Sequence, residues 1–157
     1  MAHRSFTDPA SKFFEDFERD DVIITRRRTV EMSDIMNFAT LTGDFYPIHI
    51  DAVTAGETRF GSRIAHGPLT FALAVGLVGL SNFYGTAIIA LKEITGLRAT
   101  APVLPGDTIH VEGTVAELDG SKNPKYGTIA VRYDVKNQRD ELVMTFLQTM
   151  LATKKSA

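Results

Sequence analysis

An apolar run between Pro68 and Leu80 restricts the possible folds of this chain more than any other stretch. Pro68 suits the first turn of a helix, because its missing N–H would have no partner there. A helix that is apolar on all sides must be buried on most of them. The sequence therefore predicts a central helix around which the rest of the domain wraps. Two sets of residues at helical spacing make up its opposite sides: Leu69, Leu73, Leu77 and Leu80, and Phe71, Ala74, Val75 and Val78.

The composition narrows the class of protein. With 157 residues, of which 44% are hydrophobic, the chain is expected to form one globular domain. A formal net charge of −2 gives no broad basic surface for nucleic acid. The sequence has no cysteine, no N-terminal apolar signal segment and no run of about 20 apolar residues that would cross a membrane. We therefore expect a cytoplasmic protein without disulfides, thiolate metal sites, or a membrane or nucleic-acid partner.

Local signals predict the elements on either side of the central helix. Before it we expect an N-terminal arm over residues 1–21, ahead of a domain over residues 22–157. That domain would begin with a strand from Val22 to Glu31, followed by a helix from Asp34 to Leu41 that is capped by Ser33. A loop would follow from Asp44 to Ile50, in which Pro47 forbids a regular helix. A second helix is expected from Ala52 to Arg59, capped by Asp51.

After the central helix, the hydrophobic period changes to that of strands. We expect His110, on the polar side of one of them, to be exposed. The whole pattern predicts an α+β fold, in which one antiparallel sheet wraps around a long central apolar helix. The four strands are expected at Thr86–Ala99, Asp107–Leu118, Thr128–Lys136 and Glu141–Ala152.

Few residues in the sequence can do chemistry. There is no phosphate-binding loop, no dinucleotide fingerprint and no nucleophile elbow. What remains is Asp44 and His49 on one constrained loop, which can act as a general acid–base pair. The start of the central helix at His66-Gly67 adds free backbone N–H groups and a partial positive charge, which would stabilise an enolate. Together they suffice to add water across a double bond next to a carbonyl.

Structural roles remain open for the same residues. Asp44 follows Gly43 and can be a turn residue, and His49 can be a half-buried histidine with a satisfied ring. His66 can cap the central helix or pack at its start. A zinc site from His49, Asp51 and His66 uses suitable ligand types, but it lacks the H-x-x-x-H spacing of helical sites, so we predict no metal.

Three motifs resemble those of one known family. Gly43-Asp44-Phe45-Tyr46-Pro47-Ile48-His49 resembles the hydratase-2 motif of the MaoC-like, (R)-specific enoyl-CoA hydratases. Ile64-Ala65-His66-Gly67 resembles that family's entry into its central helix. The segment 101–108 (APVLPGDT) resembles its P-V-x-x-G-D-T turn between strands. The three occur in the family's order, and the resemblance covers most of the chain from Val22 to Ala152.

The resemblance implies a single hot-dog fold that dimerises by joining two sheets, and a substrate that is an acyl-CoA or acyl-carrier-protein thioester of fatty acid metabolism. It implies that Asp44 and His49 are the acid–base pair and that the Gly67 amide is the oxyanion donor, with no metal or redox cofactor. Tyr46, Pro47, His66 and Val75 are the residues we expect to contact substrate.

Two positions depart from the family pattern. Tyr46 stands where the family usually has Asn, and Val75 stands where some short bacterial members carry a serine. Both differences bear on which substrate is bound more than on which reaction is catalysed. A branched or dicarboxylic enoyl thioester is therefore as credible a substrate as a straight-chain one. A hot-dog thioesterase and a non-catalytic acyl-thioester-binding subunit are the alternative functions.

Overall fold

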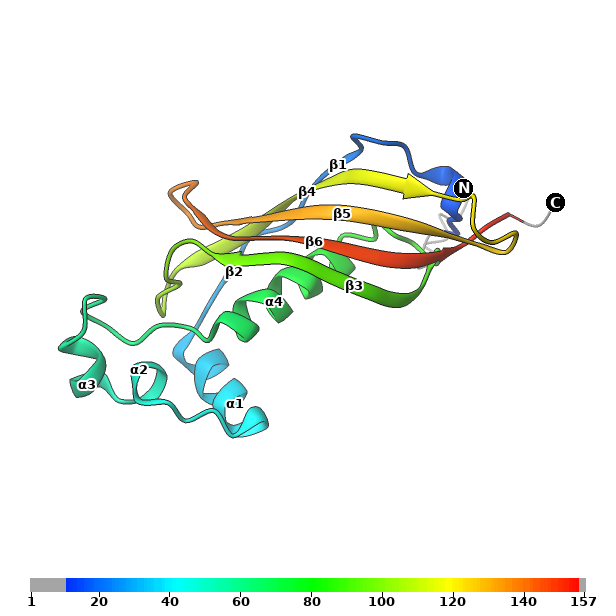
Figure 1. Ribbon diagram of the computed structural model, residues 1–157. Coiled ribbons are helices and arrows are strands. Elements are labelled where there is room, and N and C mark those ends of the chain that lie inside the picture. Colours follow the sequence, from blue (N-terminus) through cyan, green and yellow to red (C-terminus); the bar gives the residue numbers. More distant parts are fainter. Residues whose placement is uncertain (1–10, 156–157) are drawn as a thin grey trace, which may run out of the picture.

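The computed structural model describes residues 11–155. It has a six-stranded antiparallel sheet with one long helix, α4, lying along it (Figure 1). The strand order is β1-β4-β5-β6-β3, and β2 also pairs with β4. The elements in chain order are η1 (Phe14–Asp16), β1 (Val22–Ile24), β2 (Arg28–Thr29), α1 (Met32–Thr42), α2 (Pro47–Ile50), α3 (Ala52–Gly56), α4 (Gly67–Leu80), β3 (Ile88–Ala99), β4 (Thr108–Asp119), β5 (Tyr126–Lys136) and β6 (Leu142–Thr153).

The predicted α+β architecture is confirmed. Each of the four long strands begins and ends within two residues of its predicted bounds, because alternation of apolar and polar residues is a local signal. The inner residues of β4 and β5 face each other in register, for example Val111 opposite Val135 and Val115 opposite Val131. All four of these valines are fully buried.

Helix α4 packs on the sheet through its aromatic and aliphatic residues. The ring of Phe71 meets Phe146 of β6 edge-on, with centroids 5.0 Å apart, and Phe146 in turn stacks on Tyr133 of β5 at 4.8 Å. Phe146 is fully buried, and full burial of such a side chain contributes about 1.5–3 kcal/mol. The single sheet covers only part of the helix, so a stripe remains exposed that the sequence predicted to be largely buried. This stripe consists of Pro68, Ala72, Gly76, Gly79 and Leu80.

The predicted strand over residues 22–31 is in fact two short strands. Between them, the Thr25 side chain takes the place of a regular ladder bond, because its hydroxyl accepts a hydrogen bond from the Val111 amide at 2.9 Å. The helix that follows begins at Met32, with Glu31 and not Ser33 as N-cap. The Asp34 carboxylate accepts a hydrogen bond from the Glu31 amide at 2.9 Å, which fixes the start of α1 two residues earlier than predicted.

The prediction that Pro47 forbids a helix was wrong. Pro47 is the first residue of α2, where a proline loses no helical hydrogen bond, and Tyr46 before it is extended as expected. Asp51 caps α3 as predicted, since its carboxylate accepts hydrogen bonds from the Val53 and Thr54 amides. That helix ends at Gly56, three residues before its predicted end at Arg59.

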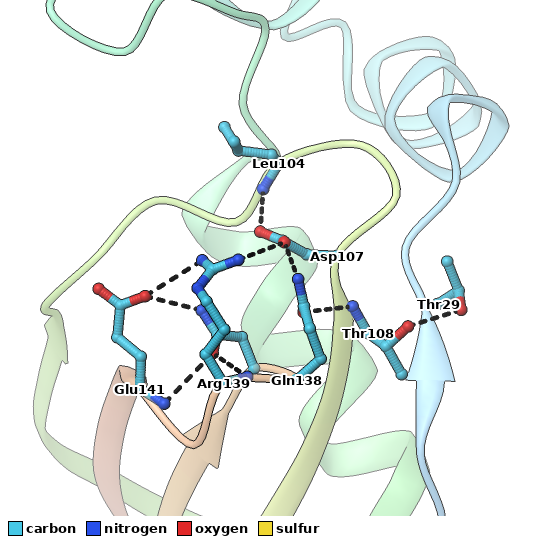
Figure 2. Close-up of polar contacts among 8 residues, drawn as sticks. Thr29, Leu104, Asp107, Thr108, Gln138, Arg139 and Glu141 are labelled. Atoms are coloured by element: carbon cyan, nitrogen blue, oxygen red, sulfur yellow. Dashed lines mark hydrogen bonds and ion pairs between the residues drawn. The ribbon is translucent and has the colours of Figure 1, made fainter.

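A buried carboxylate fixes the turn before β4 (Figure 2). Asp107 is only 5% exposed, and it accepts hydrogen bonds from the Leu104 amide at 2.8 Å and from the Gln138 side chain at 2.7 Å. The Arg139 guanidinium lies 3.8 Å from the same carboxylate. Because Gln138 and Arg139 belong to the turn between β5 and β6, Asp107 holds these two turns together at one end of the sheet.

The described part of the predicted arm lies against the sheet. Phe17 is buried in the core, and the Lys12 ammonium lies 5.3 Å from the centroids of both Phe17 and Phe83. Residues 1–10 of the arm lie outside the described residues, and the domain boundary at residue 22 stays a prediction. Across residues 11–155, the helices are all too short or too polar to cross a membrane.

Candidate active site

Helices α1, α2 and α3 lie beyond one end of the sheet, on the side where α4 begins (Figure 1). Gly43 ends α1 in the left-handed conformation, with φ of 79°, which turns the chain toward Asp44. Pro47 then starts α2 and brings His49 into its last turn. These local signals set the Asp44–His49 segment next to the N-terminus of α4.

The ring of His49 is oriented by a backbone carbonyl. Its Nδ1 lies 2.8 Å from the oxygen of Ile64, in the segment that leads into α4. A carbonyl oxygen only accepts hydrogen bonds, so Nδ1 carries the proton. In the neutral ring, the lone pair is therefore on Nε2, where it can accept a proton from a water molecule.

His66 is oriented in the same way but is fully buried. Its Nε2 lies 3.0 Å from the backbone oxygen of Asp44, and its ring stacks on His49 with centroids 3.8 Å apart. The Phe38 ring of α1 contacts it from another side, at 5.0 Å. His66 thus joins the start of α4 to the Asp44 segment, while its buried Nδ1 has no partner within residues 11–155.

The Asp44 carboxylate is exposed and lies close to both histidines. One ligand atom each of Asp44, His49 and His66 fall within 4.8 Å of one another. One carboxylate oxygen also accepts a weak hydrogen bond from the Tyr46 amide at 3.3 Å. The three residues are of types that can hold a metal ion, and the same spacing suits a water molecule shared between Asp44 and His49.

Gly67 is the first residue of α4, and its amide has no helical partner. No heavy atom lies within 4 Å of the position that a Cβ would occupy there. Close packing therefore does not explain this glycine. Its N–H and the positive end of the α4 dipole remain accessible to an approaching oxygen atom.

His49 and Gly67 line one cavity of about 230 Å³. Most of the lining residues of this cavity were not predicted from the sequence, including those in the segment that follows β3. The P-V-x-x-G-D-T motif, which begins in that segment, was the signal that could have located them. The Val103 carbonyl accepts a hydrogen bond from the Ala65 amide at 2.8 Å, which ties that segment to the start of α4. The remaining lining residues are Arg59, Phe60, Ile64, Ala65, Thr70, Ala99, Thr100, Ala101, Pro102, Val103, Val143 and Met144.

The expected substrate contacts do not share this cavity. Tyr46 is 67% exposed, and neither Pro47 nor His66 lines the cavity. Val75 lines a second, apolar cavity of about 220 Å³ farther along α4, together with Tyr84, Tyr133 and Gln148. The structure thus brings Asp44, His49, His66 and Gly67 together and leaves Val75 apart.

Two further polar residues are placed by the structure. The Thr54 hydroxyl and the Thr54 and Val53 amides all donate to Asp51, which keeps the pKa of that carboxyl below its usual range and gives it a capping role. His110, predicted to be exposed, is only 4% exposed. At this start of β4, Ile109, His110 and Val111 are all buried, so neither face of the strand is open to solvent.

Taken together, a sheet wrapped on one helix and an Asp–His pair beside that helix's N-terminus define a hot-dog domain with a candidate hydration site. The family model named MaoC like domain matches residues 16–137, and the chain belongs to this family. The family assignment confirms the resemblance seen in the three sequence motifs.

Named relatives agree with this assignment. Over 106 residues, which are 68% of this chain, it is 40% identical to Protein MaoC of Klebsiella aerogenes and 37% identical to the 3-hydroxybutyryl-CoA dehydratase of Methylorubrum extorquens. These matches span 31% and 65% of the two relatives' own lengths. An (R)-specific enoyl-CoA hydratase of Rhodospirillum rubrum is 33% identical over 106 residues, which are 68% of this chain and 71% of that protein.

Solved structures confirm the fold. A monoamine oxidase regulatory protein from Archaeoglobus superposes with a TM-score of 0.88 at 36% identity, covering 92% of this chain and 96% of that one. The MaoC-like dehydratase from Rhodospirillum rubrum superposes with a TM-score of 0.81 at 28% identity, covering 94% and 100% of the two chains.

Proposed function

We propose that this protein adds water reversibly across the double bond of an enoyl thioester, with Asp44 and His49 as the acid–base pair. The observation that carries the proposal is the meeting of three groups at one place. The Asp44 carboxylate lies within 4.8 Å of a His49 ring nitrogen, and His49 shares a cavity with the free amide end of α4 at Gly67. The named activities of the relatives support the reaction class.

In the proposed reaction, a water molecule is held between the Asp44 carboxylate and Nε2 of His49. The pair removes one proton from the water as its oxygen bonds to C3. The π electrons of the C2–C3 double bond move onto the thioester carbonyl, and the resulting enolate oxygen accepts a hydrogen bond from the Gly67 amide. A proton then returns from the pair to C2, which restores the thioester.

The proposed chemistry needs neither a metal nor a redox cofactor, because side chains activate the water and the substrate is not oxidised or reduced overall. We propose an acyl-CoA or an acyl-carrier-protein thioester as the substrate and the cytoplasm as the place of action. Tyr46, Pro47 and His66 would then act on the substrate indirectly, by shaping the segment that carries Asp44 and His49.

We also propose a homodimer formed through β3. This strand is at the edge of the sheet, and its other side has no partner within residues 11–155. Its apolar side chains are uncovered: Ile89 is 51% exposed and Leu91 is 58% exposed. An exposed apolar edge strand needs cover. The exposed stripe of α4 offers a second apolar surface of this kind.

The test of the reaction uses crotonyl-CoA, with enoyl absorbance and free thiol followed in parallel, after dialysis against a chelator. Asp44→Asn and His49→Ala are each expected to remain folded and to reduce turnover by about 10²-fold or more. Asp51→Asn is the matched control, because Asp51 caps α3 and is expected to leave turnover unchanged.

The same assay separates the alternatives. Loss of enoyl absorbance without thiol release supports a hydratase, whereas thiol release would identify a thioesterase. Neither signal, with any enoyl thioester, would point to a binding subunit. Wild-type rates for both the Asp44 and the His49 variants would refute the assigned pair.

A further inference from the structure

The cavity beside His49 has one permanently charged side chain on its wall, that of Arg59. Most of the other lining residues are apolar, and the polar ones besides His49 are the two threonines Thr70 and Thr100. In pockets of this kind, a small number of polar groups fixes the orientation and the identity of the ligand. Arg59 is therefore the group on this wall most able to select among substrates.

The Arg59 guanidinium is not engaged by an acid. It lies over the adjacent Phe60 ring, with 4.8 Å between its central carbon and the ring centroid, and Phe60 lines the same cavity. Within residues 11–155 it forms no ion pair, in contrast to Arg28, which binds Asp34 at 2.8 Å, and Arg139, which binds Glu141 at 3.2 Å. Its planar set of donors matches a carboxylate or a phosphate, and both are oxyanions.

The size of the cavity favours an anion close to the reacting carbons. At about 230 Å³ it is smaller than the 300–1,000 Å³ of typical ligand pockets. It can therefore take a short acyl chain, but not that chain together with the long pantetheine arm of the carrier. Arg59 is itself exposed, so its guanidinium is free to meet an anion, and an acyl chain that lies beside His49 and Gly67 and ends in a carboxylate would meet it on the wall of the same small cavity.

We infer that Arg59 binds a carboxylate on the acyl chain, and that the preferred substrate is a short dicarboxylic enoyl thioester. This inference rests on the proposed function. Phe60 keeps the guanidinium over its ring at the cavity wall, and the carboxylate forms a charge-assisted pair with it while the double bond lies beside His49. Arg59 is thus a specificity-determining residue and takes no part in proton transfer.

The test compares crotonyl-CoA with fumaryl-CoA, in which a carboxylate replaces the methyl group at the end of the same four-carbon chain. The wild-type protein is expected to prefer fumaryl-CoA in kcat/KM. Arg59→Gln is expected to raise KM for fumaryl-CoA by about 10-fold, the lower end for a lost charge-assisted hydrogen bond, and to change KM for crotonyl-CoA less than about 2-fold. Arg63→Gln is the matched control, because Arg63 lies in the same segment but does not line the cavity.

A carrier phosphate is the other source of an oxyanion, and the N-acetylcysteamine thioesters of the same two acids lack it. If Arg59→Gln weakens both CoA thioesters equally and neither N-acetylcysteamine thioester, Arg59 binds a carrier phosphate and the inference is overturned. An unchanged KM for all four thioesters, or the same change in the Arg63 variant, overturns it as well.

Binding without turnover separates this inference from the proposed reaction. Succinyl-CoA and butyryl-CoA are saturated and differ by the same carboxylate. Calorimetry is expected to give tighter binding of succinyl-CoA to the wild-type protein and no such preference in Arg59→Gln. If no enoyl thioester is hydrated but this preference is found, the reaction is wrong and the anion site stands. If the preference is absent while crotonyl-CoA is hydrated, the anion site is wrong.

Discussion

Replacing His66 by phenylalanine tests whether this residue positions Asp44 or only fills space. Phenylalanine keeps a flat ring of similar size against Phe38 and His49, whose ring centroids lie 5.0 and 3.8 Å from that of His66. It removes the hydrogen bond from Nε2 to the Asp44 carbonyl, which is 3.0 Å long. It also removes the buried Nδ1, which has no partner within the described residues.

The two changes act on stability in opposite directions. Losing one neutral hydrogen bond costs about 0.5–1.5 kcal/mol, and removing an unpaired buried polar atom recovers about 1–3 kcal/mol. Asp44 is exposed, so water can replace the lost donor at its carbonyl. We therefore expect the free energy of unfolding to change by less than about 2 kcal/mol, which corresponds to less than about 8 °C in melting temperature.

Activity is expected to respond far more strongly. Without His66, nothing in the described chain holds the Asp44 carbonyl, and a shift of about 1 Å in a catalytic group can cost about 10²-fold. His66→Phe should therefore lower kcat by about 10- to 100-fold with a nearly unchanged thermal melt. His66→Ala is the control for packing and should lower the free energy of unfolding by about 2–5 kcal/mol, because it leaves a cavity. Wild-type kcat in a folded His66→Phe protein would refute the positioning role.

Three further predictions follow from other parts of the structure. Gly67→Val should lower turnover much more than melting temperature, because an added Cβ meets no atom within 4 Å; equal losses of activity and stability would make Gly67 structural. Leu91→Lys, on the exposed edge strand β3, should shift the mass measured by light scattering from dimer to monomer, and an unchanged mass would exclude dimerisation through this edge. Burial raises the pKa of Tyr133 to about 12 and raises the pKa of Tyr84 as well, and their hydroxyls are 2.8 Å apart. Since an unfolded tyrosine has a pKa of about 10, these two tyrosines should add nothing to the pH dependence of the free energy of unfolding below about pH 10 and should lower that free energy as the pH approaches about 12. The Tyr84→Phe/Tyr133→Phe double variant should show a smaller fall between about pH 10 and pH 12, and an unchanged slope would contradict the assignment.

The fold could be predicted where its signals are local. The apolar run before Leu80 and the alternation in the four long strands depend only on neighbouring residues, and their elements form as expected. The predicted secondary structure was wrong where one residue type is compatible with two different local structures. Pro47 breaks a helix in its interior but starts one at its first turn, and only the surrounding chain decides between the two.

Burial could not be predicted where it depends on distant segments. His110 alternates with apolar neighbours as an exposed residue would, yet it is buried because both faces of β4 are covered at that point. Asp107 reads as a turn residue, but its carboxylate is held by Gln138, 31 residues later. Alternation reports which residues share a face and does not report what lies over that face.

The sequence pointed to the candidate site through the types of its residues, and it gave no information on their hydrogen-bond partners. Asp44 and His49 are the titratable residues of one short segment, so the sequence could single them out. The orientation of each histidine comes instead from backbone carbonyls 15 and 22 residues away, those of Ile64 and Asp44. Such partners carry no signal in residue type, because every residue has a carbonyl.

These backbone contacts decide which ring nitrogen of each histidine donates a hydrogen bond and which one can accept a proton. Irregular segments between helices leave carbonyl groups without helical partners, and here two of them each take the N–H of one imidazole. His49 must then present Nε2 as its acceptor, and His66 is held as a donor to the Asp44 segment. The presentation of His49 Nε2 as a proton acceptor is therefore a property of the backbone path between α1 and α4, and substitutions that move this path are expected to change the proposed reaction even if they leave every side chain of the site in place.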